Sequence, residues 1–342
     1  MKFGRIVRKK GILILTNAVK FAFNVVFAYV YQMIFGPENT LAGVAVNIGF
    51  TTLPDMDVGI LPLPMCGIII VLYTLAGIVS QFAYAPIGVA FIVYFLFVVV
   101  ILLLSSEPIA MKTSISFLLC FVFCQANPVS AERLPIRLLS LFIGGVLVSL
   151  WLLFRWKHHG IGKNGRTLME QIRFCAKRPG YIFRCALGIS TAMVIGMAFG
   201  LKRPMWISIV VMSLTQVTFE DTKMRIKYRS MATVLGVAVF SGIMVRFIPP
   251  QYAMVFILSI GYLSFFTSQY KYTQIVNAIC ALNASLFLLD AQTAVVERIT
   301  WLAVGIVLVL AVWGIEYIIK RFNKTLQVVE TLKSRRKNCV DT

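Results

Sequence analysis

Two arginines in one short charged stretch are the residues of this sequence best suited to binding chemistry. Arg225 and Arg229 are four residues apart, so on a helix they would share one face. Two guanidinium groups on one face would form a cationic patch that could recruit an anion by electrostatic steering. The stretch could also be a solvated turn that only orients the chain, so its surroundings matter. Its six charged residues are Glu220, Asp221, Lys223, Arg225, Lys227 and Arg229.

The sequence around this stretch is typical of a multi-pass membrane protein. Of the 342 residues, 59% are hydrophobic and only 13% are charged. Apolar runs of roughly 17–25 residues recur along the chain, and a run of that length can cross a bilayer as a helix. The sequence therefore predicts an all-α polytopic protein in the lipid bilayer, with about twelve transmembrane helices. The apolar segments lie near residues 14–36, 39–54, 63–82, 84–105, 109–126, 133–155, 180–200, 204–218, 230–248, 251–268, 272–290 and 296–319.

The basic residues predict the orientation of the chain in the membrane. The formal net charge is +20, from 33 basic and 13 acidic residues. The basic residues gather in blocks between apolar runs, which is typical of cytoplasmic loops and argues against nucleic acid binding. An even number of membrane crossings between successive large basic blocks brings all of these blocks to the same side of the membrane. We therefore expect both termini on the cytoplasmic side of the plasma (inner) membrane.

The chain contains an internal repeat. Each copy holds six apolar segments, so the two copies enter the membrane from the same side and are parallel. The sequence predicts four regions: a first six-helix repeat at 1–156, a basic cytoplasmic linker at 157–179, a second six-helix repeat at 180–320 and a basic cytoplasmic tail at 321–342. The first and second repeats are called here the first and second halves. Corresponding residues include Phe35-Gly36 and Phe199-Gly200, Lys20 and Arg184, Asp57 and Asp221, and Glu132-Arg133 and Glu297-Arg298.

The second segment of each half is the predicted lining of a transport pathway. Both segments are short, and short or broken segments at matching positions of two halves are typical of transporter substrate sites. Non-helical backbone at membrane depth is tolerated where it lines a wet cavity. The polar side chains available there are Thr51, Thr52, Thr215 and Gln216.

The charged stretch would then form the cytoplasmic mouth of that pathway. Glu220 and Asp221 would close the segment at 204–218, and Arg225 and Arg229 would open the next one. Asp57 recurs at the matching place in the first half, whereas the arginines do not. A single cationic patch at the mouth would steer an anion towards it.

The stretch "RPMWISIVVMSLTQ…R…RSMATVLG" resembles the signature of the fusaric acid resistance-type (FUSC-like) membrane proteins, also called aromatic acid exporters. The resemblance lies in Trp206 ahead of a short helix, Arg225, and Arg229 followed by Ala232-Thr233 and Gly236. Alanine replaces the first glycine of the family pattern, and the long soluble domain of many members is missing. The resemblance implies efflux of aromatic carboxylic acids or similar organic anions, coupled to protons. It extends over about 184–245.

Ionisable residues inside or near apolar segments supply further candidates. Lys20 and Arg184 could hold the substrate carboxylate, or could reach the cytoplasmic headgroups instead. Glu132-Arg133 and Glu297-Arg298 would open the last helix of each half, as structural pairs or as an outer gate. A proton relay would need carboxylates, of which the candidates are Asp57, Asp221, Glu107, Asp290, Glu132 and Glu297.

Two alternatives to a secondary active exporter remain open. The first is an organic-anion channel, since a basic mouth would serve a pore equally well. The second is a non-transporting membrane scaffold for envelope assembly that binds partners through its basic linker and tail. The sequence predicts no enzyme, no cofactor and no metal site, because we find no nucleophile with a base, no metal-ligand spacing and no Walker A sequence. A homo-oligomer is compatible with the sequence.

Overall fold

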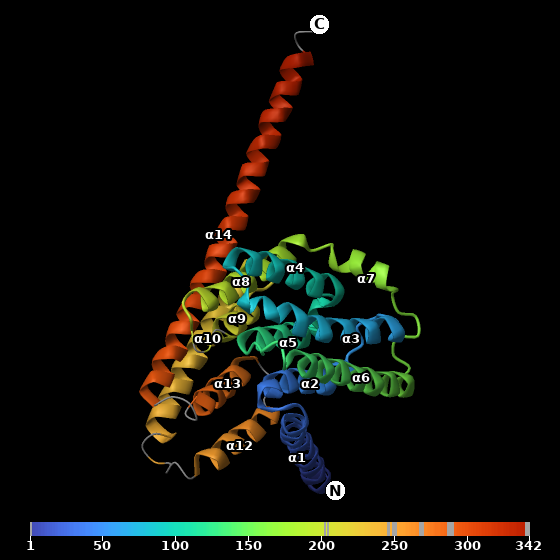
Figure 1. Cartoon of the computed structure of the whole chain (residues 1–342), viewed down its shortest axis with the longest axis vertical. Helices are drawn as coiled ribbons and strands as arrows, with labels where there is room; N and C mark the ends of the chain where they lie inside the picture. The colour runs from blue at the N-terminus through green and yellow to red at the C-terminus, as the bar shows by residue number, and fades with distance from the viewer. Residues whose placement is uncertain are drawn as a thin grey trace.

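The protein is an all-helical bundle with one long projecting helix, as the computed structural model shows (Figure 1). The structure describes residues 2–201, 203, 205–244, 247, 252–266, 270–285 and 291–338. The predicted all-α class is confirmed. The α-helices are α1 (Lys2–Phe35), α2 (Thr40–Thr52), α3 (Pro62–Val79), α4 (Ile87–Ser105), α5 (Ser114–Ala126), α6 (Leu134–His159), α7 (Leu168–Cys175), α8 (Pro179–Ala198), α9 (Met205–Leu214), α10 (Phe219–Val239), α12 (Ala253–Leu263), α13 (Tyr270–Ser285) and α14 (Ala291–Asn338).

The predicted multi-pass membrane character is also confirmed. Within the described residues, six helices are long and apolar enough to cross a membrane. Large apolar side chains point outward from them, for example Ile92 and Leu96 on α4, which are 59% and 57% exposed and suited to lipid contact. The six segments are Ile12–Phe35, Pro62–Tyr84, Ile87–Ser105, Leu134–His159, Pro179–Ala198 and Val295–Phe322.

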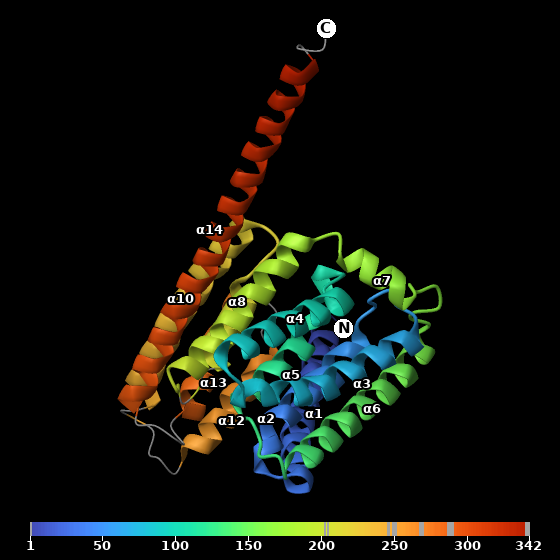
Figure 2. The same cartoon turned by 45° about the horizontal axis from the view of Figure 1, so that its top comes forward.

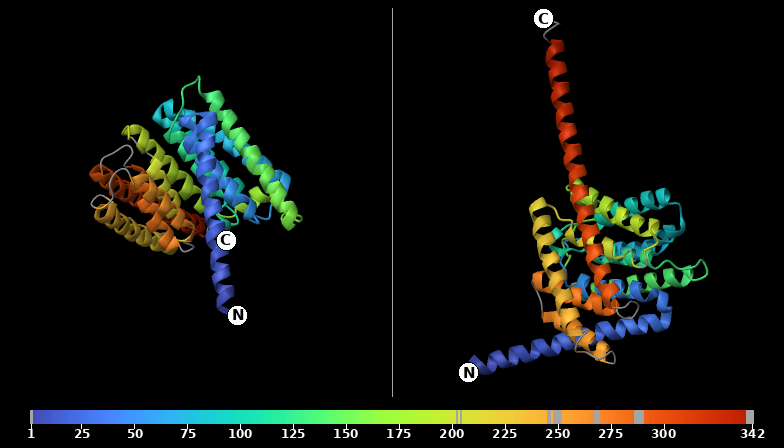
Figure 3. Two further views of the ribbon diagram at one scale, coloured as in Figure 1. Left: turned by 90° about the horizontal axis from the view of Figure 1, so that it is seen from below. Right: turned by 90° about the vertical axis from the view of Figure 1, so that its left-hand side faces the viewer.

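The arrangement of about twelve crossings in two parallel repeats stays a prediction. Helices α2 and α9 contain 13 and 10 residues, too few to cross about 30 Å of hydrocarbon at 1.5 Å per residue. Helices α1 and α14 also run in clearly different directions (Figure 3). Matching helices nevertheless make similar contacts, since α2 packs on α1 and α6, and α9 packs on α8 and α14.

The two halves meet along α4 and α8, which lie side by side (Figures 1 and 2). Phe95 of α4 and Phe183 of α8 form an edge-to-face pair across this contact, with ring centroids 6.1 Å apart. A second contact joins α5 to α9. The two halves are therefore packed into one core, and the ends of these helices can share a site.

Small residues allow the closest helix contacts. A Cβ atom on Gly236 of α10 would lie 2.7 Å from the Cβ of Ala278 on α13. Small residues at such positions let helix backbones approach one another inside a membrane. We expect Gly236→Val to lower the free energy of unfolding by roughly 1–3 kcal/mol through overpacking. Thermal unfolding of the purified protein measures this, and an unchanged midpoint would contradict the close contact.

The charged stretch belongs to a helix, contrary to the segment boundary that we predicted near residue 230. Helix α10 begins at Phe219, because the Thr218 side chain accepts a hydrogen bond from the Asp221 backbone N–H at 3.1 Å. Glu220 and Asp221 suit the first turn, since negative charge is favourable at a helix N-terminus. Both acids and both arginines therefore lie on the first turns of α10, and neither acid closes the preceding segment.

The predicted linker and tail are helical over much of their length. Helix α7 starts at a capping box formed by Thr167 and Glu170. Arg166, just before it, donates to the Val58 carbonyl at 2.7 Å, so the linker is fixed to the bundle. Arg178, just after it, pairs with Glu107 at 2.6 Å. In the predicted tail, α14 continues past residue 320 to Asn338.

Candidate functional site

Ser213 at the end of α9 binds both arginines of the charged stretch. Arg225 donates from Nη1 to the Ser213 carbonyl at 3.1 Å, and Arg229 donates from Nη1 to the Ser213 hydroxyl. Arg229 is 6% exposed, whereas Arg225 is half-buried. The prediction that the two arginines share one helix face is confirmed, and that face is turned towards α9.

A cavity of about 670 Å³ lies beside Arg225, where the ends of several helices meet. Its walls come from the loop after α4, from the first turns of α5, α8, α10 and α13, and from the end of α9. Both halves therefore contribute to it. The described lining residues are Ser106, Ile109, Ala110, Lys112, Ser114, Ile115, Leu118, Tyr181, Cys185, Met212, Ser213, Gln216, Asp221, Met224, Arg225, Thr273, Gln274 and Asn277.

The lining combines cationic, polar and apolar groups. Among the described lining residues, Lys112 and Arg225 are cationic and Asp221 is anionic. Asp221 is held in place by the Thr218 hydroxyl, which lies 2.6 Å from its Oδ2. The remaining walls are apolar or carry neutral hydrogen-bonding groups. A cavity of this size and composition can hold a small organic anion, with its charge near the cations and its carbon skeleton on the apolar wall.

The break between α9 and α10 brings Thr215 and Gln216 to the cavity region. Thr215 is buried and donates from its hydroxyl to the Val211 carbonyl of α9 at 2.8 Å. The Gln216 side-chain amide donates to the Thr215 carbonyl at 2.6 Å, and Gln216 lines the cavity. The Gln216 backbone N–H donates to the Thr222 hydroxyl at 3.3 Å, which connects the break to α10.

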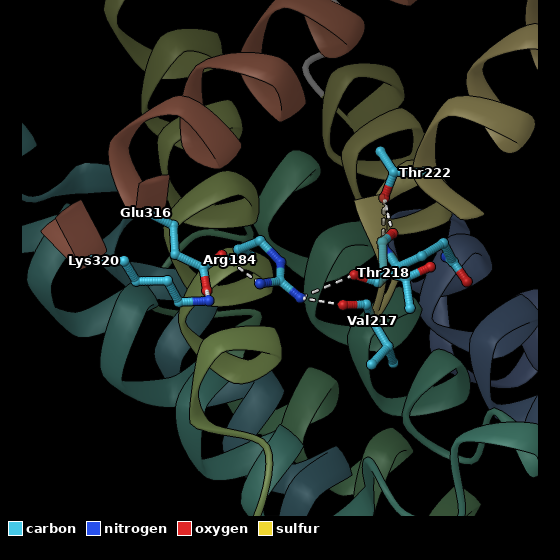
Figure 4. Close-up of polar contacts among 7 residues, drawn as sticks. Arg184, Val217, Thr218, Thr222, Glu316 and Lys320 are labelled. Atoms are coloured by element: carbon cyan, nitrogen blue, oxygen red, sulfur yellow. Dashed lines mark hydrogen bonds and ion pairs between the residues drawn. The ribbon is translucent and has the colours of Figure 1, made fainter. Parts of the chain in front are cut away.

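Arg184 forms a buried ion pair with Glu316 near the same break (Figure 4). The two side chains are 4% and 6% exposed. The other terminal nitrogen of Arg184 donates to the carbonyls of Gln216 and Val217, at 3.1 and 2.8 Å. The guanidinium carbon also lies 3.8 Å from the centroid of a Trp313 ring. Arg184 therefore joins α8, α14 and the α9–α10 break, and its charge is already balanced by Glu316.

Trp206 and Arg298 form a second contact between α9 and α14. The Arg298 guanidinium carbon lies 4.5 Å from the centroid of the Trp206 ring, a cation–π geometry. Glu297 and Arg298 lie inside α14, which begins at Ala291, so they do not open the helix as we predicted. Thr233 is buried on α10.

The predicted residues of the first half lie apart from this cluster. The hydroxyls of Thr51 and Thr52 donate to carbonyls of their own helix, Asn47 at 2.9 Å and Ile48 at 2.6 Å. Asp57 accepts from the Gly59 backbone N–H at 3.0 Å. None of these three lines the cavity described above.

The charged candidates of the first half are exposed at Lys20, Glu132 and Arg133, whereas Glu107 is buried and pairs with Arg178 of the linker. Lys20 is exposed on α1, unlike its buried counterpart Arg184. Glu132 and Arg133 are exposed in the turn before α6, with Arg133 at the N-cap position as predicted. Asp290, one of the candidate carboxylates for a proton relay, lies outside the described residues.

Sequence reasoning missed Lys112 and Glu316. Glu316 had a visible signal, because it is an acid within the apolar run that forms the last membrane segment, and such residues are costly unless paired. Lys112 had the same kind of signal, because it lies within the apolar segment predicted near 109–126, although the structure places it in the turn before α5. Among the described residues, no group of three or more His, Cys, Asp and Glu side chains is arranged to hold a metal ion.

Residues 191–312 match the family model described as "Fusaric acid resistance protein-like". The match includes Trp206, Arg225, Arg229, Thr233 and Arg298, and it ends before Glu316. No curated protein and no solved structure matches the chain. The resemblance found in the sequence is thereby confirmed: this is a multi-pass membrane protein, and residues 191–312 of its second half are similar to the fusaric acid resistance protein-like family.

Proposed function

We propose that the protein is a secondary active transporter that exports aromatic carboxylic acids or similar organic anions, coupled to protons. The observation that carries this proposal is the cavity of about 670 Å³, whose wall combines Lys112 and Arg225 with apolar groups. An aromatic carboxylate needs both features, a cation for its charge and an apolar surface for its ring. The family description also points to resistance against an aromatic acid.

The cavity lies at the end of the bundle that the positive-inside rule assigns to the cytoplasm. The loop after α4 and the starts of α8 and α10 meet there, next to the basic linker that contains α7. An exporter must take its substrate from the cytoplasm, so this location supports loading from inside a plasma membrane. Asp221 lines the cavity, and we assign it the proton-carrying role among the predicted carboxylates.

Accumulation of a panel of radiolabelled aromatic acids tests the proposed function. We expect cells that contain the protein to accumulate less of at least one acid than cells that lack it. The difference should vanish when the proton gradient is collapsed. Equal accumulation of every acid in both kinds of cell would contradict aromatic acid export and favour a scaffold. Electrogenic flux that persists without a proton gradient and saturates poorly would indicate an anion channel instead.

A further inference from the structure

Lys112 brings a positive charge from the first half to a cavity whose other charged walls come from the second half. It follows the 3₁₀ turn Ile109–Met111 and precedes α5. Among the described lining residues, Lys112 is the charged contribution of the first half, and Asp221 and Arg225 are those of α10. The first half therefore supplies a charged side chain to the site, although its predicted site residues lie elsewhere.

The backbone at Lys112 is in a conformation that lysine does not favour. Its φ and ψ are 55° and 34°, in the left-handed region. This conformation is unfavourable for a residue with a Cβ atom, whereas glycine adopts it readily. Glycine at this position would make the turn more stable than lysine does. An unfavourable conformation at this lysine points to a functional role for its side chain, which lines the cavity.

The groups around Lys112 in the cavity leave room for an anionic ligand. Tyr181 and Cys185 from α8, and Asp221 and Arg225 from α10, line the same cavity. Burial of part of the Lys112 side chain lowers its pKa below the ordinary lysine value, and the positive charge of Arg225 lowers it further. Lys112 and Arg225 line the same cavity, so their positive charges repel each other. An anion bound between them would relieve that repulsion.

We propose that Lys112 and Arg225 together bind the carboxylate of an aromatic monocarboxylic acid, with one cation supplied by each half of the protein. Ile115 and Leu118 of α5 and Met212 of α9 provide the apolar wall for the ring. This inference rests on the proposed function and deepens it. It makes the substrate site a shared one, so that a relative movement of the two halves would change the distance between the two cations.

Benzoate binding to the purified full-length protein in lipid nanodiscs tests the proposal. We expect Lys112→Gln and Lys112→Gly to bind benzoate about tenfold more weakly or worse, since hydrogen bonds to charged groups contribute roughly 1.5–3 kcal/mol. Lys112→Gly should unfold at the same temperature as the wild type or higher, because glycine suits the left-handed conformation. Lys157→Gln, an exposed lysine at the end of α6, is the matched control and should bind as the wild type does.

The pH profile separates a binding role from a structural one. Benzoate binding to the wild type should weaken as the pH rises through the lowered pKa of Lys112, where the ammonium loses its proton. Lys112→Arg should bind benzoate and keep binding over that range, because a guanidinium stays protonated there. This variant leaves the other titratable groups of the cavity unchanged, namely Tyr181, Cys185, Asp221 and Arg225. A change in the pH profile of benzoate binding would therefore result from residue 112.

The outcomes distinguish this inference from the proposed function. If the wild type binds benzoate and Lys112→Gly binds it equally well, the Lys112 proposal is overturned while anion transport stands. If the wild type binds neither benzoate nor any other aromatic acid, the proposed function fails and the Lys112 proposal fails with it. If Lys112→Arg follows the pH profile of the wild type, another group titrates and the proposal is wrong.

Discussion

Glu316→Ala is expected to lower the free energy of unfolding by about 3–5 kcal/mol, because it leaves a buried charge without its partner. Arg184 is 4% exposed, and its remaining contacts among the described residues would be the carbonyls of Gln216 and Val217 and the face of Trp313. Neutral acceptors do not replace a carboxylate in a site that excludes water. Unfolding of the purified protein in detergent, by heat or denaturant, measures this loss.

Removal of the other partner is expected to cost less. In Arg184→Met, Glu316 retains Lys320, whose Nζ lies 2.7 Å from its Oε1 and whose side chain is 71% exposed. The remaining carboxylate therefore keeps a counterion that water can reach. The double variant, Arg184→Met with Glu316→Ala, should be more stable than Glu316→Ala alone, since it removes the stranded charge.

Lys320→Ala is the control for these variants. Glu316 keeps Arg184 in this variant, and the contact that is lost comes from a Lys320 side chain that is 71% exposed, so the variant should unfold close to the wild type. A Glu316→Ala protein as stable as the wild type would show that the ion pair does not stabilise the contact between α8 and α14. A double variant less stable than both single variants would show that the side chains matter for packing more than for charge.

The all-helical membrane fold could be predicted from sequence because hydropathy acts on each segment separately. A run such as Ile87–Ser105 is apolar enough to indicate a membrane helix without knowledge of its neighbours. Helix boundaries depend on single hydrogen bonds instead. The α10 start was misplaced because the first turns of this helix carry the charged stretch, so the apolar run begins only near residue 230, whereas the Thr218 cap starts the helix before those charges.

The sequence could predict the arrangement of site residues only where those residues lie on one helix. Arg225 and Arg229 lie on a single helix, so their spacing alone gave their common face. Arg184 and Glu316 are 132 residues apart in the chain, and only tertiary packing joins them. The cavity is also assembled from helix ends that no local pattern relates. Thr51 and Thr52 of α2 were predicted to line the pathway, but their hydroxyls donate hydrogen bonds to carbonyls of their own helix.

Replacement of the arginines of α10 by glutamine is expected to separate substrate binding from stability. Arg225 lines the cavity, so Arg225→Gln should raise the KM for export of an aromatic carboxylate by about tenfold or more. Arg229 is buried against Ser213, so Arg229→Gln should lower the free energy of unfolding by roughly 1–3 kcal/mol. The double variant should still insert into the membrane but export less acid.

Transport by inverted vesicles, at a range of acid concentrations, gives KM and maximal rate for each variant at matched protein levels. Arg173→Gln, an exposed arginine on α7, removes the same charge and should leave both values unchanged. A lower maximal rate with unchanged KM in Arg225→Gln would place this arginine in the conformational step and not in binding. Both arginines contact Ser213 at the cavity wall, and among the described lining residues α10 supplies no cation besides Arg225. Normal export by a well-expressed double variant would therefore exclude both arginines from the substrate site.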